Sequence, residues 1–373
     1  MWSPRVKPDA KFALGMSLLQ KLCRETEGDN FAFSPLSLEI AFSMLVAGVG
    51  GGTKKQLLNL LGYANEADLH SMHAELIKDQ RLPIKMANKC LVRNELEVRK
   101  SFATLVKEKY QSEVESVDFA NDGKKVEAEL NAWVALKTSD MIKQLLSPGA
   151  LVSDTILVLL NAVYFKGTWA KEFDTVPHKM DFTLRNGSTV KKNFMTQESF
   201  DFKYCQTDKL KMVNIPYQEA ECYMVVGLPT DESKHIDEVL ATMTAAEMSS
   251  AVEKLNAVCR GTEVRLTMPK FRIDYKYGNL VKHMKALGVH KIFNGGDFGG
   301  LFGNSIAPVW VSSVVHQTVI EVDEFGTRAA AAAITCLCNS LPKHVDVNRP
   351  FVFMLGTAKQ TPYFMGICAM PVN

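Results

Sequence analysis

Two histidines, His70 and His73, would share one face of a helix because they are three residues apart. Paired imidazoles can bind a metal ion, but no cysteine or acidic residue accompanies them at a spacing typical of a complete site. We therefore interpret the pair as part of a solvated helix face and predict no bound metal.

Cys336 and Cys338 form a Cys-x-Cys pair, which can bind a soft metal or undergo redox chemistry. A metal site would need further ligands, and the sequence indicates none. We interpret both residues as loop thiols, with a redox role as the alternative. The eight cysteines are scattered, and a chain of this length does not need disulfides, so we expect mostly free thiols.

Two glycine-containing segments are similar to enzyme motifs, but each lacks residues that its motif requires. Residues 48–54 (GVGGGTK) lack the Gly-Lys-Ser/Thr of a phosphate-binding loop and follow a helical pattern instead of a strand. Residues 303–307 (GNSIA) lack the final glycine of a nucleophile elbow. Both observations argue against an enzyme, and we expect no cofactor.

The segment 324–334 (EFGTRAAAAAI) does not fit ordinary globular patterns. Alanine is the best helix former, so propensity alone predicts a helix here. However, the segment follows a strand pattern at 314–322 and precedes residues 336–350, which have little regular periodicity. The alanine run therefore requires an explanation other than a permanent helix.

The elements around these segments indicate an α+β protein. Helical patterns dominate the first 150 residues, where 53–56 (TKKQ) match a capping box and Gly62 is placed to end the helix. Strands follow from about residue 155, beginning with an apolar strand around Asn161 that we expect to be buried on both faces. Asn186-Gly187 fits a hairpin turn as well as a glycosylation sequon.

Composition narrows the class of protein. The 373 residues are 47% hydrophobic and 23% charged, which excludes dominant disorder and allows a sizeable core. A net charge of +2 without long basic runs gives no reason to expect a nucleic-acid or membrane partner, and the apolar runs are too short to cross a bilayer. No linker-like segment divides the chain, so we expect one domain over 1–373.

The N-terminus contains a second ambiguous pattern. Basic residues precede a short apolar stretch at 12–19 and imitate a signal peptide, but Phe12, Met16, Leu19 and Cys23 recur at helical spacing. We expect an amphipathic helix, in a chain that is either leaderless or a mature form.

A series of ordered segments identifies a family resemblance. The chain resembles the serpins in the segments 30–37 (NFAFSPLS), 161–169 (NAVYFKGTW), 268–271 (MPKF), 287–289 (LGV), 297–298 (DF), 315–316 (VH), 321–324 (EVDE) and 349–353 (RPFVF). The resemblance implies three β-sheets, eight or nine helices and an exposed reactive-centre loop at about 324–348, in a metastable fold. It also implies a suicide inhibitor of serine proteases, whose cleaved loop inserts into the central sheet.

An inserting strand would turn alternate residues into the core, and these must be small and uncharged. Counting from Thr327, the inward set would be Thr327, Ala329, Ala331, Ala333 and Thr335, all of which are small. By resemblance, the hinge of the loop comprises Glu324, Gly326, Thr327, Ala329, Ala330, Ala331 and Ala332. The alternative is a non-inhibitory serpin used for binding, storage or chaperoning.

The resemblance assigns two further groups of residues. Ser34, Ser37, Asn161 and His316 match the shutter, a polar cluster where the central sheet opens, and Trp169 matches the breach, where insertion begins. Ordinary core packing is compatible with both assignments.

The family's spacing from Gly326 places the scissile bond at Ser340–Leu341. A small residue before the cut favours an elastase-like target over a trypsin-like one, with Asn339 as an alternative register and Leu337 as an alternative suited to chymotrypsin-like enzymes. We expect a monomer that acts in the extracellular space, as most of the family does, with the cytoplasm as the alternative.

Overall fold

The computed structural model describes residues 10–26, 28–78, 84–218, 222–258, 262–277, 280–302, 308–325, 342–357 and 362–372. These residues form three main sheets, a two-stranded hairpin and ten α-helices, which confirms the α+β class. The helix number exceeds the expected eight or nine, and three of the ten helices, α7, α9 and α10, are short. The helices are α1 (Ala10–Glu25), α2 (Pro35–Gly48), α3 (Gly51–Leu61), α4 (Glu66–Lys78), α5 (Lys100–Tyr110), α6 (Gly123–Lys137), α7 (Ile236–Ala241), α8 (Ala245–Ala257), α9 (Leu280–Ala286) and α10 (Gly299–Phe302).

A five-stranded central sheet organises one half of the molecule. Its order is β13 (Phe271–Tyr277), β14 (Val311–Val322), β4 (Leu157–Phe165), β2 (Ile84–Arg93) and β3 (Glu113–Val117). Every residue of β4 is buried, which confirms the expected strand covered on both faces. β4 and β14 are parallel neighbours and both run towards the same end of the sheet.

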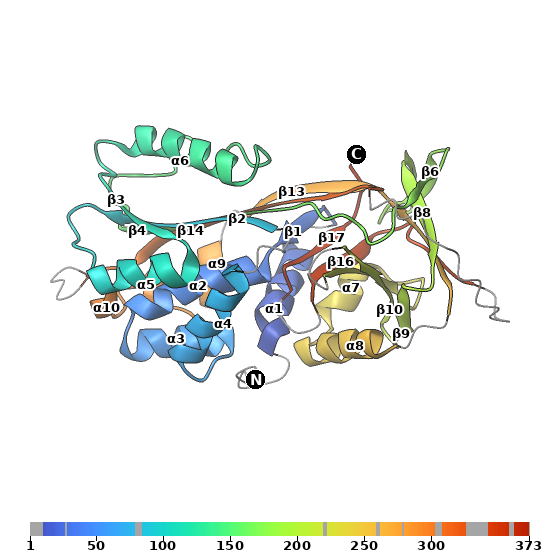
Figure 1. Cartoon of the computed structure of the whole chain (residues 1–373), viewed down its shortest axis with the longest axis horizontal. Helices are drawn as coiled ribbons and strands as arrows, with labels where there is room; N and C mark the ends of the chain where they lie inside the picture. The colour runs from blue at the N-terminus through green and yellow to red at the C-terminus, as the bar shows by residue number, and fades with distance from the viewer. Residues whose placement is uncertain are drawn as a thin grey trace.

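The other sheets lie towards the opposite end of the molecule (Figure 1). A six-stranded sheet has the order β1 (Phe31–Phe33), β17 (Phe364–Cys368), β16 (Phe351–Gly356), β11 (Tyr223–Pro229), β10 (Leu210–Pro216) and β9 (Lys203–Gln206). A four-stranded sheet has the order β15 (Lys343–Asp346), β12 (Val264–Pro269), β8 (Phe194–Ser199) and β5 (Asp174–Thr175). The predicted turn at Asn186-Gly187 joins β6 (Met180–Thr183) to β7 (Thr189–Lys192), so the hairpin prediction is confirmed.

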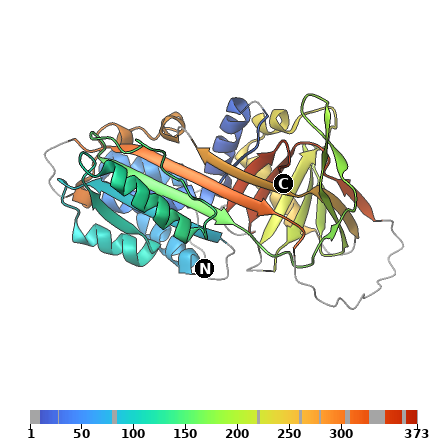
Figure 2. The ribbon, with the colours of Figure 1, turned by 90° about the horizontal axis from the view of Figure 1, so that it is seen from above.

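Helices cover both faces of the central sheet. α6 lies over one face, and α2 and α5 lie on the other (Figures 1 and 2). Because side chains alternate along β4, Leu160 and Tyr164 face the α6 side, whereas Leu159 and Asn161 face the α2 side. Two apolar clusters therefore enclose the sheet.

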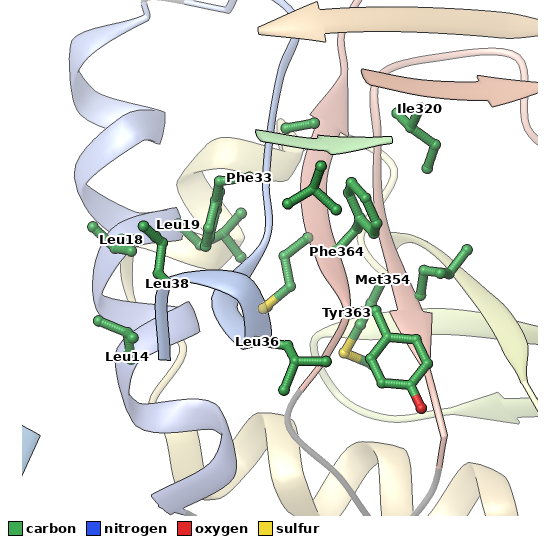
Figure 3. Close-up of a cluster of buried hydrophobic side chains, with 14 of the residues drawn as sticks. Leu14, Leu18, Leu19, Phe33, Leu36, Leu38, Ile320, Met354, Tyr363 and Phe364 are labelled. Carbon is green, nitrogen blue, oxygen red and sulfur yellow. The ribbon is translucent and has the colours of Figure 1, made fainter. Parts of the chain in front are cut away.

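The larger cluster continues into the first two helices. The expected amphipathic N-terminal helix is α1, which buries Leu14, Leu18 and Leu19. Figure 3 shows Leu19 beside Phe33 and near Leu38 at the start of α2, with Phe364 further across the same cluster. Among the described residues, no helix has the length and apolarity needed to cross a membrane.

The predicted capping box at 53–56 is wrong. α3 begins at Gly51, two residues earlier, so Thr53 lies inside its first turn. The Thr53 hydroxyl accepts a hydrogen bond from the Asp297 amide at 3.0 Å, and the Gln56 side chain accepts from the His290 and Lys291 amides. These side chains therefore accept hydrogen bonds from the backbone amides of a neighbouring loop and do not cap the helix. Gly62 ends α3 as predicted, with a left-handed φ of 75°.

We predict that Thr53→Val lowers the free energy of unfolding by about 1–2 kcal/mol, because it removes the acceptor of the Asp297 amide. Thr53→Ser keeps the hydroxyl and should lose less. Denaturant unfolding of both variants provides the measurement, and an equal loss in both would contradict the assigned hydrogen bond.

Candidate functional site

A row of three polar side chains crosses the middle of the central sheet. Asn161 on β4 pairs in register with Asn88 on β2 and with His316 on β14. All three are at least nine-tenths buried, although the surrounding positions are apolar. Buried polar groups are costly unless they are hydrogen-bonded, so the partners of this row determine whether the strands stay together.

The side chain of Asn161 joins the row together. Its amide group donates to the Asn88 side-chain oxygen, to the Ser37 hydroxyl and to the Ser37 carbonyl, the last at 3.1 Å. Its oxygen accepts from His316 Nδ1. The junction of β4 and β14 is thus fixed by side chains in addition to the strand ladder.

The start of α2 supplies the remaining partners. Ser34 is the N-cap of α2, and its hydroxyl accepts from the Ser37 amide at 3.1 Å. The Ser34 amide donates to His316 Nε2 at 3.1 Å. Since Nε2 accepts, the proton of the neutral imidazole lies on Nδ1, where it donates to Asn161. The structure therefore brings Ser34, Ser37, Asn161 and His316 together.

The environment of His316 keeps its ring neutral. Burial lowers the pKa of His316 from an ordinary 6.5 to about 3, because a charged imidazolium would be desolvated. A protonated ring would also donate from both nitrogens and clash with the Ser34 amide. The cluster therefore depends on the uncharged form.

A second group of contacts lies where β14 ends. The Trp169 indole donates to the Asp323 carbonyl at 2.7 Å, and the Trp169 amide donates to the Phe325 carbonyl. The ring is 2% exposed and stacks on Tyr217 at a centroid distance of 4.2 Å. Trp169 thus holds the segment that leads out of β14.

Glu324 is held by its side chain and its backbone. Its carboxylate lies 2.6 Å from the Lys270 amine and accepts from the Thr175 hydroxyl, while its carbonyl accepts from the Phe173 amide. Partial burial alone would raise the pKa of Glu324, but the hydrogen bond and charge of Lys270 hold it below its ordinary value. Glu324 is therefore charged at neutral pH.

The described chain stops beyond this point and resumes at Pro342, before β15. The predicted hinge residues Gly326, Thr327, Ala329, Ala330, Ala331 and Ala332 lie outside the described residues, as do Ser340, Leu341, Cys336 and Cys338. Phe325, the last described residue before the gap, has a side chain that is 59% exposed.

Three contributing residues were not anticipated from the sequence. Asn88 is a polar residue in a strand whose next inward positions, Cys90 and Val92, are buried and apolar, and that break in the pattern is a usable signal. Lys270 lies within a segment that resembles the family, but no local pattern indicates its pairing with Glu324. Thr175 gives no sequence signal.

The prediction of a solvated face for His70 and His73 is wrong. Both are buried where α4 packs against α2 and α5. His70 hydrogen-bonds to Tyr110, and His73 lies 3.2 Å from the Glu39 carboxylate. Within the described part of the chain, no group of three or more potential ligands could hold a metal.

The described cysteines are Cys23, Cys90, Cys205, Cys222 and Cys368, and all of them are free, as expected.

Comparison with known proteins gives a consistent result over nearly the whole chain. The model of the family "Serpin (serine protease inhibitor)" matches residues 9–371. The leukocyte elastase inhibitor of Xenopus tropicalis is 30% identical over 95% of this chain and 96% of its own. The protein Iris of Ixodes ricinus is 32% identical over 89% of both chains. The structure of native protease nexin-1 with heparin has a TM-score of 0.85 at 27% identity, covering 97% of this chain and 98% of its own.

We predict that acid destabilises the native protein through His316. Its folded pKa of about 3 lies below the unfolded value of 6.5, so the unfolded chain binds the proton first as pH falls. Stability should therefore decrease from about pH 6.5 towards pH 3, by about 1.4 kcal/mol per unit from this residue. Denaturant midpoints across this range provide the measurement.

His316→Gln should reduce this pH dependence even if it lowers stability at pH 7, and the buried His70, whose pKa is lowered to about 4, should account for part of what remains. His344→Gln, which removes an exposed histidine, is the matched control. Equal slopes in the wild type and His316→Gln would show that His316 is not the group responsible.

Proposed function

The chain belongs to the serpin family, which consists of protease inhibitors and other proteins that are not enzymes, and on this premise we propose that it is a suicide inhibitor of a serine endopeptidase. We treat residues 1–373 as one serpin domain with a reactive-centre loop at about 324–348. The observation that carries the proposal is the central pair of parallel strands, β4 and β14, with the alanine-rich segment following directly from β14.

The proposed reaction begins as ordinary proteolysis. The serine oxygen of the protease attacks the Ser340 carbonyl, the bond to Leu341 breaks, and the Leu341 nitrogen leaves with a proton. Ser340 is then esterified to the protease. Insertion of the loop carries the attached enzyme away before water can hydrolyse this ester.

The strand directions favour a position for the inserted segment between β4 and β14. A chain that leaves β14 and folds back runs antiparallel to β14, and also antiparallel to its parallel neighbour β4. It could therefore form antiparallel ladders with both strands once they separate. The inward set Thr327, Ala329, Ala331, Ala333 and Thr335 is small enough to face the core.

The two groups of polar contacts support separate roles in this proposal. We assign Ser34, Ser37, Asn161 and His316, together with Asn88, to the shutter that holds β4 and β14 closed. Their hydrogen bonds can be exchanged for others when the strands part. We assign Trp169 and the ion pair of Glu324 with Lys270 to the breach, where the first loop residues must be released.

Two observations support an elastase-like target: the residue before the proposed cut and the name of a relative. Ser340 offers a small neutral side chain before the cut, which suits the narrow pocket of an elastase-like protease. A relative that is 30% identical is named leukocyte elastase inhibitor. Leu337 remains the candidate for a chymotrypsin-like enzyme.

Denaturing gels with elastase, chymotrypsin and trypsin test the function. We expect a stable band at the summed mass with elastase, because the ester survives denaturation, and a cut after Ser340 by mass spectrometry. Cleavage by all three enzymes without such a band would support the non-inhibitory alternative. In that case the cleaved chain should gain no thermal resistance.

A matched pair of variants tests insertion of the alanine segment. Ala331→Glu places a charge on the inward face of the proposed strand, and we expect cleavage without trapping because that charge would be buried. Ala330→Glu places the same charge on the outward face and should keep the inhibitory activity. The measurement is the moles of inhibitor consumed per mole of protease; equal effects of the two variants would contradict the proposed register.

A further inference from the structure

Lys89 is a buried charged residue on the face of the central sheet that α6 covers. It is 6% exposed, and its neighbours on the same face of β2, Ala87 and Leu91, belong to the apolar cluster beneath α6. A lysine amine in such a place is costly unless it is paired. Its partners should therefore reveal what the charge does.

Three side chains from two other elements compensate the Lys89 amine. It lies 2.8 Å from the Glu115 carboxylate and 3.3 Å from that of Glu113, both on β3. It also lies 4.5 Å from the centroid of the Trp133 ring on α6, within the range of a cation–π interaction. One amine thus connects β2, β3 and α6.

Lys89 lies at the end of the paired part of this sheet edge. Pairing of β2 with β3 starts at the Lys89–Glu113 register pair. A cavity of about 250 Å³ lies beside the earlier residues of β2, with Trp133 and Lys137 of α6 among its lining residues. Lys89 therefore contacts Trp133 where that ring lines the cavity.

Lys89 is also next in sequence to a member of the polar cluster. It follows Asn88, whose side chain points to the opposite face and accepts from Asn161. Two successive residues of β2 therefore hold the buried cluster on one face and α6 on the other.

α6 shares an apolar cluster with the two strands that the proposed insertion would separate. Its Val126, Leu130 and Val134 belong to the same apolar cluster as Leu160 of β4 and Val319 of β14. When β4 and β14 part, α6 cannot stay packed with the cluster residues of both strands. Whether α6 moves with β4 or with β14 then depends on which part of the sheet it contacts most strongly.

We propose that Lys89 is a positioning residue that keeps α6 on the β2–β3 side of the sheet while the gap between β4 and β14 opens. This inference rests on the proposed function. With α6 held to one side, the gap stays clear for the loop. Without the Lys89 contacts, α6 obstructs the gap, insertion slows, and more of the ester is hydrolysed before trapping.

Lys89→Met tests this role, since it keeps the length of the side chain and removes its charge. Lys89→Arg is the conservative variant, because a guanidinium can bind carboxylates and stack on Trp133. Lys191→Met is the matched control, since it breaks an exposed ion pair with Asp181 far from α6. Trp133→Leu removes the same contact from α6 and serves if Lys89→Met does not fold.

Two measurements separate this inference from the proposed function. Hydrogen exchange of the α6 amides in the uncleaved protein should become about three- to tenfold faster in Lys89→Met and in Trp133→Leu, but not in Lys89→Arg or Lys191→Met. The moles of inhibitor consumed per mole of trapped protease should rise about twofold or more in the same two variants, because both lose the contact between Lys89 and Trp133.

Unchanged exchange of α6 in both Lys89→Met and Trp133→Leu would overturn the proposal, and so would faster exchange with unchanged consumption. If the wild-type chain traps no protease, the proposed function fails. Exchange then still decides whether Lys89 holds α6.

Discussion

The hydrogen bond between Asn161 and His316 is the contact on which the arrangement of this molecule depends. It crosses the two parallel strands at the centre of a sheet that is covered by helices on both faces. Because the site is buried, each polar atom in it must find a partner, and the residues of the cluster come from four separate parts of the chain. The capped start of α2 therefore has to lie directly beneath the strands, and the strand register has to place Asn88 opposite Asn161.

Hydrogen bonds suit the junction that the proposed function requires, one that is firm and still able to open. Apolar packing alone would specify the register of β4 and β14 less sharply than the polar cluster, in which Asn161 lies opposite His316. At the end of β14 the contacts differ in kind, since the Glu324–Lys270 ion pair is about four-fifths buried and involves charged groups. The contacts of β14 are therefore hydrogen bonds between neutral groups at the centre of the sheet and an ion pair beyond the end of the strand.

The sequence predicts the structure well where local patterns and family segments carry the information. It indicates β4, β14 and the hairpin, and four of the five side chains of the central cluster. It predicts poorly where burial is decided by distant segments: His73 lies beside Glu39 of another helix, and Thr53 binds a loop more than 240 residues away. The pairing of Lys270 with Glu324 and of Lys89 with Trp133 depends on tertiary packing in the same way, and no spacing in the sequence indicates either.

The positions of two tryptophans give the protein built-in optical reporters. Trp169 donates its indole proton to Asp323 at the end of β14, whereas Trp133 lies over the Lys89 amine on α6. An indole that loses a hydrogen bond or a neighbouring charge changes its emission, so the two rings sense different events without an attached dye. In variants that keep one of the four tryptophans, Trp169 emission would follow release of the loop in the proposed reaction, and Trp133 emission would show whether α6 keeps its contact with Lys89.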